Sequence, residues 1–283
     1  MKTGFTFKGK HSDDFGAVVK TVSRPITPEM KAKTYESDVM DGNHDFSCAN
    51  AYGREFYRNR IFTVSVQVSG DELSDIIRKV SRISAWLMGK GELIFDDTPL
   101  VRWNARVVNT IDYVPERRGK KAVLSVSFEV APFAECLFRV ADGPILDSDI
   151  CLDTDMSIDI PSQFYFQPHE ENVTVYNMGE WYARPVFTYV SNEAISELGI
   201  ECNGKTLLIS GIPEERQAVK IVIDFENYTV TDDVGNLLNF VSGDFFELAP
   251  GGNEVNHICN ASEYSLNVDY RAKYMFDFTG GGI

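Results

Sequence analysis

The sequence predicts a protein of two parts, an α+β domain with a single helix over residues 1–140 and an all-β sandwich over residues 141–283. Three observations predict this arrangement. The chain has 283 residues, enough for about two domains. A helical repeat of apolar residues occurs once, in the first part, whereas short apolar segments between turn residues fill the second. The first part carries 21 Lys/Arg and 18 Asp/Glu, and the second carries 6 and 24, so the two parts are expected to face different surroundings.

The first part is expected to form a split-barrel-like sheet. Phe5 and Phe7 share one face of an opening strand, and Phe62, Val64 and Val66 alternate with polar residues in a later one. Strands are predicted at residues 5–7, 17–22, 62–68, 92–95, 100–113 and 122–131.

One helix is predicted over residues 69–88, where apolar residues recur at helical spacing. Ser69 and Glu72 have the spacing of a capping box, and Gly89 is placed to end the helix. The opposite side of the helix carries Arg78, Lys79 and Arg82. A solvated face is the simpler interpretation of these charges, and a charged contact with a partner is the alternative.

Residues 23–60 differ from the segments around them. They hold two prolines, then a polar stretch from Ser37 to Asn43, then a stretch rich in aromatic residues and arginines from Tyr52 to Arg60. Little in this segment could form a core of its own, and structureless loops of this length are usually functional or disordered. We predict an extended arm or hairpin that makes contacts outside its own domain.

The second part is predicted to be a β-sandwich because short strands follow one another between turn signals. The dipeptides Asn203-Gly204, Gly235-Asn236 and Gly251-Gly252 supply residues that tolerate positive φ at turns. Strands are predicted at residues 173–176, 186–190, 204–209, 219–225, 228–231, 254–259 and 266–270.

Composition excludes several classes of partner. The formal charge of −15 disfavours nucleic acid and anionic membranes. No apolar run approaches the length that spans a bilayer or that a secretory signal needs, so we expect a soluble protein made in a cytosol. Five cysteines without CxxC spacing indicate neither a disulfide framework nor a zinc site.

No catalytic, cofactor-binding or metal-ligating residue is predicted. The chain has no GxSxG, HExxH or phosphate-loop motif. The spaced aspartates between Asp142 and Asp159 lack the glycine and glutamate of a calcium-binding EF-hand loop. Adjacent acidic pairs could suggest a glycosidase, but neighbours on a strand point to opposite faces, so loop charges are the preferred interpretation. These pairs are Asp96-Asp97, Glu170-Glu171, Glu214-Glu215 and Asp232-Asp233.

Segments in both parts together resemble one family, the distal tail proteins (Dit) of siphophages and prophages of Gram-positive hosts. In the first part these are GFTFKGKHSDDFGAVV, Tyr57-Arg58-Asn59-Arg60 leading into FTVSVQVSG, ISAWLMGKGELIFDDTP and RWNARV. In the second part they are IVIDFENYTVTDDVGNLL and VSGDFFELAPGGNEV. Each motif is modest, but their order over nearly the whole chain is specific.

The resemblance implies a structural protein of the virion tail tip, a baseplate component without enzymatic activity, assembled in the bacterial host cytoplasm. It implies a homo-oligomer, a hexameric ring hub formed by residues 1–140, with the arm at residues 23–60 reaching a neighbouring subunit. Residues 141–283 would form a galectin-like or carbohydrate-binding-module-like sandwich outside the ring. The implied partners are the tail tube protein and the tail-associated baseplate protein, with no cofactor.

A second function remains open from the residues themselves. The sandwich could be a non-catalytic, lectin-like module that contacts host cell-wall sugars, since sugar sites commonly present aromatic faces. The second part offers four candidates, Tyr176, Trp181, Tyr182 and Tyr264. Core or interdomain packing is the commoner use of such side chains.

Overall fold

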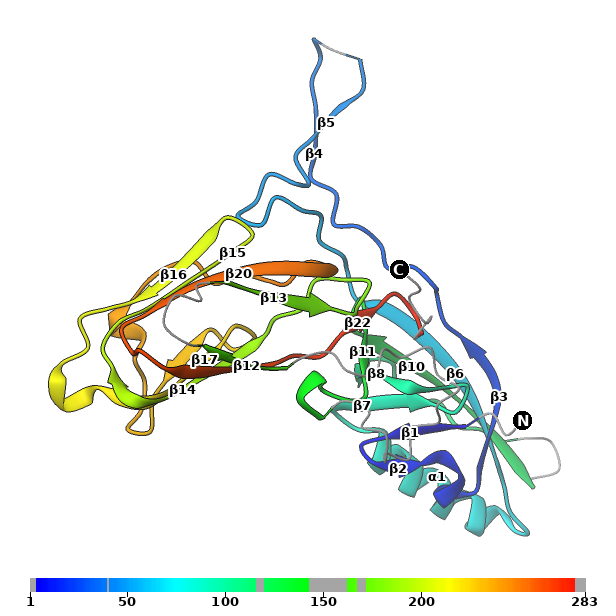
Figure 1. Cartoon of the computed structure of the whole chain (residues 1–283). Coiled ribbons are helices and arrows are strands. Elements are labelled where there is room, and N and C mark those ends of the chain that lie inside the picture. The colour runs from blue at the N-terminus through cyan, green and yellow to red at the C-terminus, as the bar shows by residue number, and fades with distance from the viewer. Residues whose placement is uncertain (1–3, 40, 116–119, 143–161, 167–171, 278–283) are drawn as a thin grey trace. The chain divides into compact units, whose positions relative to one another are not determined.

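The computed structural model describes residues 4–39, 41–115, 120–142, 162–166 and 172–277. The chain divides into two compact units (Figure 1). The first comprises residues 1–134 with 275–277, and the second comprises residues 135–274 with 278–283. The assignment of separate roles to residues 1–140 and 141–283 stays a prediction.

The first unit is built on one antiparallel sheet with the strand order β2-β1-β7-β8-β10-β6-β3. A further short strand, β9, pairs with β10. Their bounds are β1 Phe5–Phe7, β2 Lys10–His11, β3 Ala17–Ser23, β6 Arg60–Ser69, β7 Lys90–Phe95, β8 Thr98–Val107, β9 Val114–Pro115 and β10 Lys121–Val130.

The longest pairing in this sheet joins β6 to β10, from Ser69 opposite Lys121 to Arg60 opposite Val130. Side chains alternate between the two faces of a strand, and every second residue is buried on both strands. The buried faces meet as four cross-strand pairs, Phe62–Phe128, Val64–Val126, Val66–Leu124 and Val68–Ala122. The predicted inward face of this strand is therefore confirmed.

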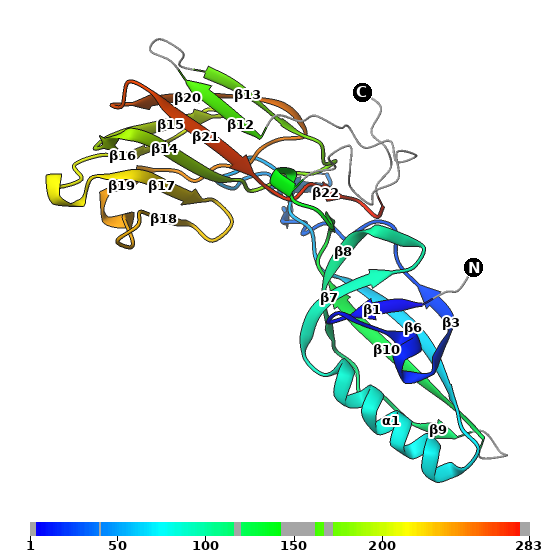
Figure 2. The ribbon, with the colours of Figure 1, turned by 60° about the horizontal axis from the view of Figure 1, so that its bottom comes forward.

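The helix α1, Leu73–Leu87, packs beside β6 and the short 3-10 helix η1, Ser12–Phe15 (Figure 2). Trp86 holds it in place, since its ring stacks on Phe5 and Phe15 and its Nε1 donates to the carbonyl of Phe7 at 2.8 Å. The predicted capping box is wrong. Glu72 is the N-cap, with no side-chain capping bond, because Ser69 is still paired within β6.

The second unit contains two five-stranded antiparallel sheets, with orders β12-β21-β14-β17-β18 and β13-β20-β15-β16-β19. The first sheet has β12 Gln163–Phe166, β14 Val186–Ile195, β17 Ala218–Asp224, β18 Thr229–Thr231 and β21 Tyr264–Asp269. The second has β13 Asn172–Asn177, β15 Leu198–Cys202, β16 Lys205–Ile209, β19 Val241–Gly243 and β20 Gly251–Cys259. Short elements complete the unit: β11 Ala134–Cys136, β22 Lys273–Tyr274, η2 Val140–Asp142, η3 Glu214–Arg216 and η4 Leu238–Phe240.

Buried apolar side chains from both sheets form the core of the sandwich. From the first sheet come Phe187, Tyr189, Ile221, Ile223, Leu266 and Val268, and from the second come Val175, Ile200, Cys202, Leu207, Ile209 and Val255. Figure 1 shows the two sheets as separate layers, with β13, β20, β15 and β16 in one and β12, β14 and β17 in the other. The predicted fold class, α+β followed by an all-β sandwich, is confirmed.

Several observed strands were not predicted, among them β12, β15 and β19, and one predicted turn is confirmed. The strand β15 carries Gly199 and Glu201, which weaken its strand signal, yet it pairs with both β16 and β20. Asn203 and Gly204 connect β15 to β16 with φ of 53° and 72°. These positive values are those of the hairpin turn that Asn-Gly favours.

The segment SGDFFELAPGGNEV is organised by one buried amide, that of Asn253, which is 1% exposed. Its Nδ2 donates to the carbonyls of Ala249 at 2.8 Å, Gly251 at 2.9 Å and Val175 at 3.3 Å. Its Oδ1 accepts from the Ala249 amide at 2.8 Å and from Asn203 Nδ2 at 3.0 Å. Asn253 therefore ties the loop at residues 249–251 to β13 and to the turn after β15, so the role of this motif is to stabilise the fold.

Among the described residues, no helix is long and apolar enough to cross a membrane.

Candidate functional site: the projecting arm

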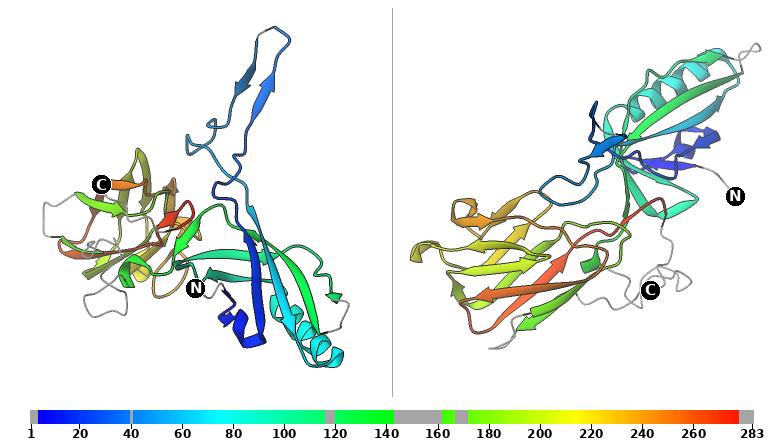
Figure 3. Two further views of the ribbon diagram at one scale, coloured as in Figure 1. Left: turned by 90° about the vertical axis from the view of Figure 1, so that its right-hand side faces the viewer. Right: turned by 90° about the horizontal axis from the view of Figure 1, so that it is seen from above.

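The most exposed part of the first unit is an arm formed by residues 24–59 (Figure 3). It is formed by two antiparallel segments of chain, and the second of them is interrupted by a loop. Near its root, the Lys31 amide donates to the Phe56 carbonyl at 2.7 Å and the Arg58 amide donates to the Glu29 carbonyl at 2.8 Å. Beyond the interruption, β4 Thr34–Glu36 pairs with β5 Asn43–Asp45.

The interruption is a lateral loop, residues 46–56, that is held by its own side chains. Asn50 Nδ2 donates to the carbonyls of Ser47 at 3.1 Å and Arg54 at 2.7 Å, and its Oδ1 accepts from the Tyr52 amide at 2.9 Å. The Arg54 guanidinium lies 4.5 Å from the ring centre of Phe56. The loop thus presents arginine and aromatic groups, the residue types that dominate binding energy at protein interfaces.

The outer hairpin of the arm has no core. Every residue of β4 and β5 is exposed, including Tyr35 at 63%. Val39 at the tip is 92% exposed. A two-stranded hairpin is marginally stable by itself in water, and exposed apolar side chains add nothing to its stability there. Both features are typical of a segment that is completed by another surface.

Arg60 fastens the arm to the sheet. It is 3% exposed, and its guanidinium donates to the carbonyls of Pro25, Ile26, Pro132 and Met275. The same group lies over the Trp103 ring, 5.1 Å from its centre. Burial lowers the pKa of Arg60 to about 10. Because a planar guanidinium has five donors in fixed directions, it can join four carbonyls that a lysine could not reach together.

Three of the acidic residues considered for a glycosidase, Asp96, Asp97 and Asp232, have structural partners. His11 Nε2 lies 3.0 Å from Asp96 Oδ1, and Asp96 also accepts from the Gly4 amide at 2.8 Å. Asp97 pairs with Arg24. Asp232 pairs with Arg216 at 3.0 Å. Glu214 and Glu215 are exposed, while the pair Glu170-Glu171 lies outside the described residues.

The metal and cysteine predictions are only partly covered by the structure. The part of the chain that the structure describes holds no group of three or more His, Cys, Asp or Glu that could bind a metal ion. The aspartate-rich stretch from residue 143 to residue 159 lies outside that part. The four described cysteines, Cys48, Cys136, Cys202 and Cys259, are free thiols.

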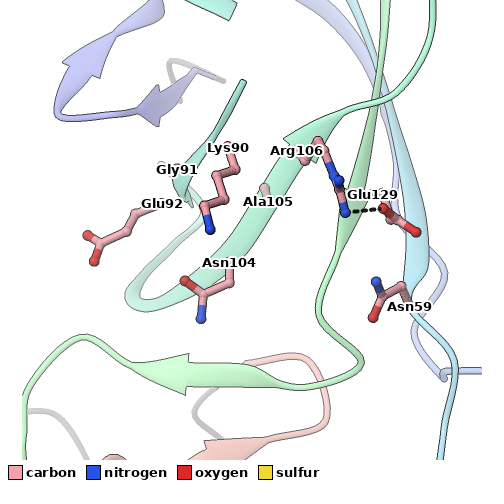
Figure 4. A pocket seen from close by; sticks show the side chains of 8 residues that line it. All are labelled: Asn59, Lys90, Gly91, Glu92, Asn104, Ala105, Arg106 and Glu129. Atoms are coloured by element: carbon pink, nitrogen blue, oxygen red, sulfur yellow. Dashed lines mark ion pairs between the residues drawn. The ribbon is translucent and has the colours of Figure 1, made fainter. Parts of the chain in front are cut away.

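A shallow groove of about 380 Å³ lies on the first unit (Figure 4). Its lining comprises Asn59, Lys90, Gly91, Glu92, Asn104, Ala105, Arg106 and Glu129. Arg106 pairs across it with Glu129 at 3.3 Å. The lining contains both signs of charge and no serine, cysteine or histidine, so its chemistry suits polar contacts with another surface.

The aromatic residues considered for sugar binding are used in different ways. Trp181 and Tyr182 meet edge to face, with ring centres 5.5 Å apart. The hydroxyl of Tyr264 lies 2.6 Å from Nδ1 of the buried His257, so it points into the sandwich. Tyr176 lies on β13. The sugar-binding alternative stays a prediction.

Comparison with known proteins finds one matching domain family, for part of the chain, and one shared fold, for nearly all of it. Residues 178–274 match the siphovirus-type tail component, C-terminal domain. No curated protein matches. The solved structure of SPP1 Dit (gp 19.1), described as a paradigm of the hub adsorption apparatus in phages that infect Gram-positive bacteria, aligns with 96% of this chain and 98% of its own. The identity is 14% and the TM-score is 0.68.

Two chains from the phage P2 baseplate in its activated conformation also align. The one with Ca aligns over 98% of this chain and 100% of its own, at 9% identity and a TM-score of 0.46. The one with Sr aligns over 97% and 99%, at 11% identity and a TM-score of 0.40. The resemblance to distal tail proteins is confirmed by the domain match and by SPP1 Dit. Residues 178–274 therefore match the family model of the siphovirus-type tail component, C-terminal domain, and the chain as a whole shares its fold with SPP1 Dit.

Proposed function

We propose that this chain is a non-enzymatic structural protein of a siphophage or prophage tail tip. Six copies form a ring hub that joins the tail tube protein to the tail-associated baseplate protein, assembled in the cytoplasm of the bacterial host. The observation that carries this proposal is the tail-component match over residues 178–274, on a chain that shares its fold with SPP1 Dit over 96% of its length.

The arm supports an assembly of this kind. Its outer hairpin exposes backbone edges, and Tyr35, Val39 and Phe46 are 63%, 92% and 49% exposed. A neighbouring subunit that covers these groups provides main-chain pairing for affinity and apolar contact for register. Closed cyclic symmetry then leaves no arm unpaired, which limits open-ended aggregation.

The charge division supports an orientation for the ring. The first part is close to neutral at +3, so copies of it can pack without strong mutual repulsion. The second part carries −18 and is proposed to face outward, where repulsion between sandwiches keeps the particles soluble.

Negative-stain microscopy and native mass spectrometry of the purified full chain test the proposal. The expected result is a six-subunit ring with a central channel and outward lobes, alone or on addition of the tail tube protein. A chain that stays monomeric at high concentration, both alone and with that partner, would contradict the proposed function.

The contribution of the arm can be removed cleanly because Met30 bridges Tyr57 at its root. Replacing residues 32–55 with Asn-Gly joins Lys31 to Phe56 through a two-residue turn, which is the loop length and sequence that β-hairpins favour. Loss of the ring with retention of the β-sheet circular dichroism spectrum is expected. An unchanged ring would show that the arm does not hold the subunits together.

A further inference from the structure

We propose that the tip of the arm of one copy docks on the outward face of helix α1 in a second copy of this chain. The acidic tip is defined as residues 36–39 and 41–45, and its main contacts on the helix are Arg78 and Arg82. The inference rests on the proposed ring assembly and specifies which two surfaces meet.

The acidic tip carries uncompensated negative charge. Residues 36–45 contain Glu36, Asp38, Asp41 and Asp45 and no lysine or arginine. Asp45 is engaged locally, since hydrogen bonds from Ser47 lower its pKa. The other three carboxylates are exposed, and none of them makes an ion pair with any residue that the structure describes. Val39 lies among them with 92% of its surface exposed.

Helix α1 has an outward face that combines apolar side chains with basic ones. Its buried side consists of Ile76, Ile83, Trp86 and Leu87. At 100° per residue, Leu73 and Ile77 lie on one flank of the exposed surface and Arg78 and Arg82 on the other, with Ser74, Ser81 and Ala85 between them. Leu73 is 50% exposed and Ile77 is 54% exposed. Apolar residues at these positions are unusual, because the solvent face of a helix is normally polar.

The two arginines have no carboxylate partner among the described residues. Arg82 lies over the Phe15 ring, 5.9 Å from its centre. The neighbouring Lys79, in contrast, pairs with Asp75 at 3.0 Å and donates to the Ser69 carbonyl at 2.9 Å. Arg78 and Arg82 are therefore available to anionic groups from outside.

Three other arginines of the first unit are already paired with a carboxylate. Arg24 pairs with Asp97, Arg102 with Glu92 and Arg106 with Glu129. The outward face of α1 thus has exposed apolar groups on one flank and, on the other, two arginines without a carboxylate partner among the described residues. The acidic tip has Val39 among carboxylates that likewise make no ion pair with a described residue. Complementary charge and shared apolar surface favour this pairing over a contact with the compensated arginines.

The contact must join two different copies. The arm ends where β6 begins at Arg60, whereas α1 follows the far end of β6 at Ser69. A ten-residue strand spans about 30 Å, and the arm projects away from α1 in Figures 1 and 3. The tip cannot fold back to its own helix, so the contact is head-to-tail, the type that closes into a ring.

Charge reversal in the full chain tests the pairing. The variants Asp38→Lys/Asp41→Lys and Arg78→Glu/Arg82→Glu are each expected to raise the concentration needed for half-assembly about tenfold, measured by sedimentation or native mass spectrometry. Combining all four substitutions restores opposite charges and should recover most of the assembly. Two controls carry the same change in charge on other exposed positions, Glu214→Lys/Glu215→Lys and Lys10→Glu/Lys121→Glu. They should assemble like the unmodified chain.

A cross-linking experiment decides the matter even where assembly is weak. In a Cys48→Ser background, a Val39→Cys chain is mixed with an Ile77→Cys chain and oxidised, and disulfide-linked dimers between the two chains are expected. The control mixes the Val39→Cys chain with a Val234→Cys chain, whose position is 73% exposed. Equal yields with Ile77→Cys and Val234→Cys would overturn the inference.

Failure of this inference is distinguishable from failure of the proposed function. A ring that forms but responds equally to the reversal variants and to their controls refutes the docking of tip on helix and leaves the tail-tip function standing. Selective cross-linking without any ring, even with the tail tube protein, supports the docking and refutes the hub.

Discussion

His257 makes the stability of the sandwich depend on pH. It lies on β20, is 2% exposed, and its Nδ1 is 2.6 Å from the hydroxyl of Tyr264. The buried Tyr189 ring is a second neighbour of His257, with ring centres 6.4 Å apart. Burial disfavours the charged imidazolium and lowers the pKa of His257 from 6.5 to about 4.

The sign and size follow from proton linkage. Above pH 6.5 the imidazole is neutral in both the folded and the unfolded chain, so the full stability is present. As the pH falls below 6.5, the unfolded chain binds a proton that the folded chain does not, and stability is lost until the pH reaches about 4. At about 1.4 kcal/mol per pH unit, the loss is about 2 kcal/mol at pH 5 and about 3 kcal/mol at pH 4.

The assay is urea unfolding of the full chain at pH 7 and pH 5, compared with His257→Gln, which does not titrate. The difference between the two proteins isolates this histidine from the many carboxylates. Relative to its own value at pH 7, the unmodified chain should lose about 2 kcal/mol more than the variant by pH 5. His44→Gln, on the exposed arm strand β5, controls for the loss of a histidine. Equal losses in the unmodified chain and in His257→Gln would refute the reasoning.

Three further predictions concern stability and can be measured by the same unfolding assay. Asn253→Ala removes the amide that joins three carbonyls and two donors, and it should cost about 2–4 kcal/mol, whereas Asn256→Ala on the exposed side of β20 should cost under about 1 kcal/mol. An equal effect of the two would contradict the network. Gly243→Ala places a Cβ against the Thr206 carbonyl at a φ of 91°, so a loss of more than about 2 kcal/mol is expected, and near-neutral behaviour would show that β19 can shift. Trp86→Phe keeps the ring stacking but removes the bond from Nε1 to the Phe7 carbonyl, and it should cost about 1–3 kcal/mol, less than Trp86→Ala, for which about 3–5 kcal/mol is expected. Similar losses for the two variants would show that the hydrogen bond dominates over packing.

Most of the strands could be predicted from the sequence because burial on one face of a sheet imposes a period of two. The segment from Phe62 to Val68 shows this period, and its apolar residues are all buried against β10. The turn at Asn203 and Gly204 could also be predicted from the sequence, because both residues adopt the positive φ that this dipeptide favours. The order of family motifs along the chain likewise needed no structure.

Local patterns failed where a distant strand competed for the same residues. Ser69 and Glu72 have the spacing of a capping box, but Ser69 is claimed by its pairing with Lys121, so the helix begins after Glu72 without a side-chain cap. Strand β15 was missed because Gly199 weakens its local preference, while pairing with β16 and β20 on both sides enforces it.

The sequence by itself determined the fold class, the division of charge between the two parts and the existence of an unusual segment at residues 23–60. Only the tertiary structure decided how that segment is anchored and what it can meet. Arg60 gathers carbonyls of Pro25, Pro132 and Met275, which are far apart along the chain, and α1 leaves Arg78 without a carboxylate partner among the described residues. Composition and periodicity show which segments are buried on average. Whether a given charged side chain is buried or left without a partner depends on which distant groups the fold places beside it.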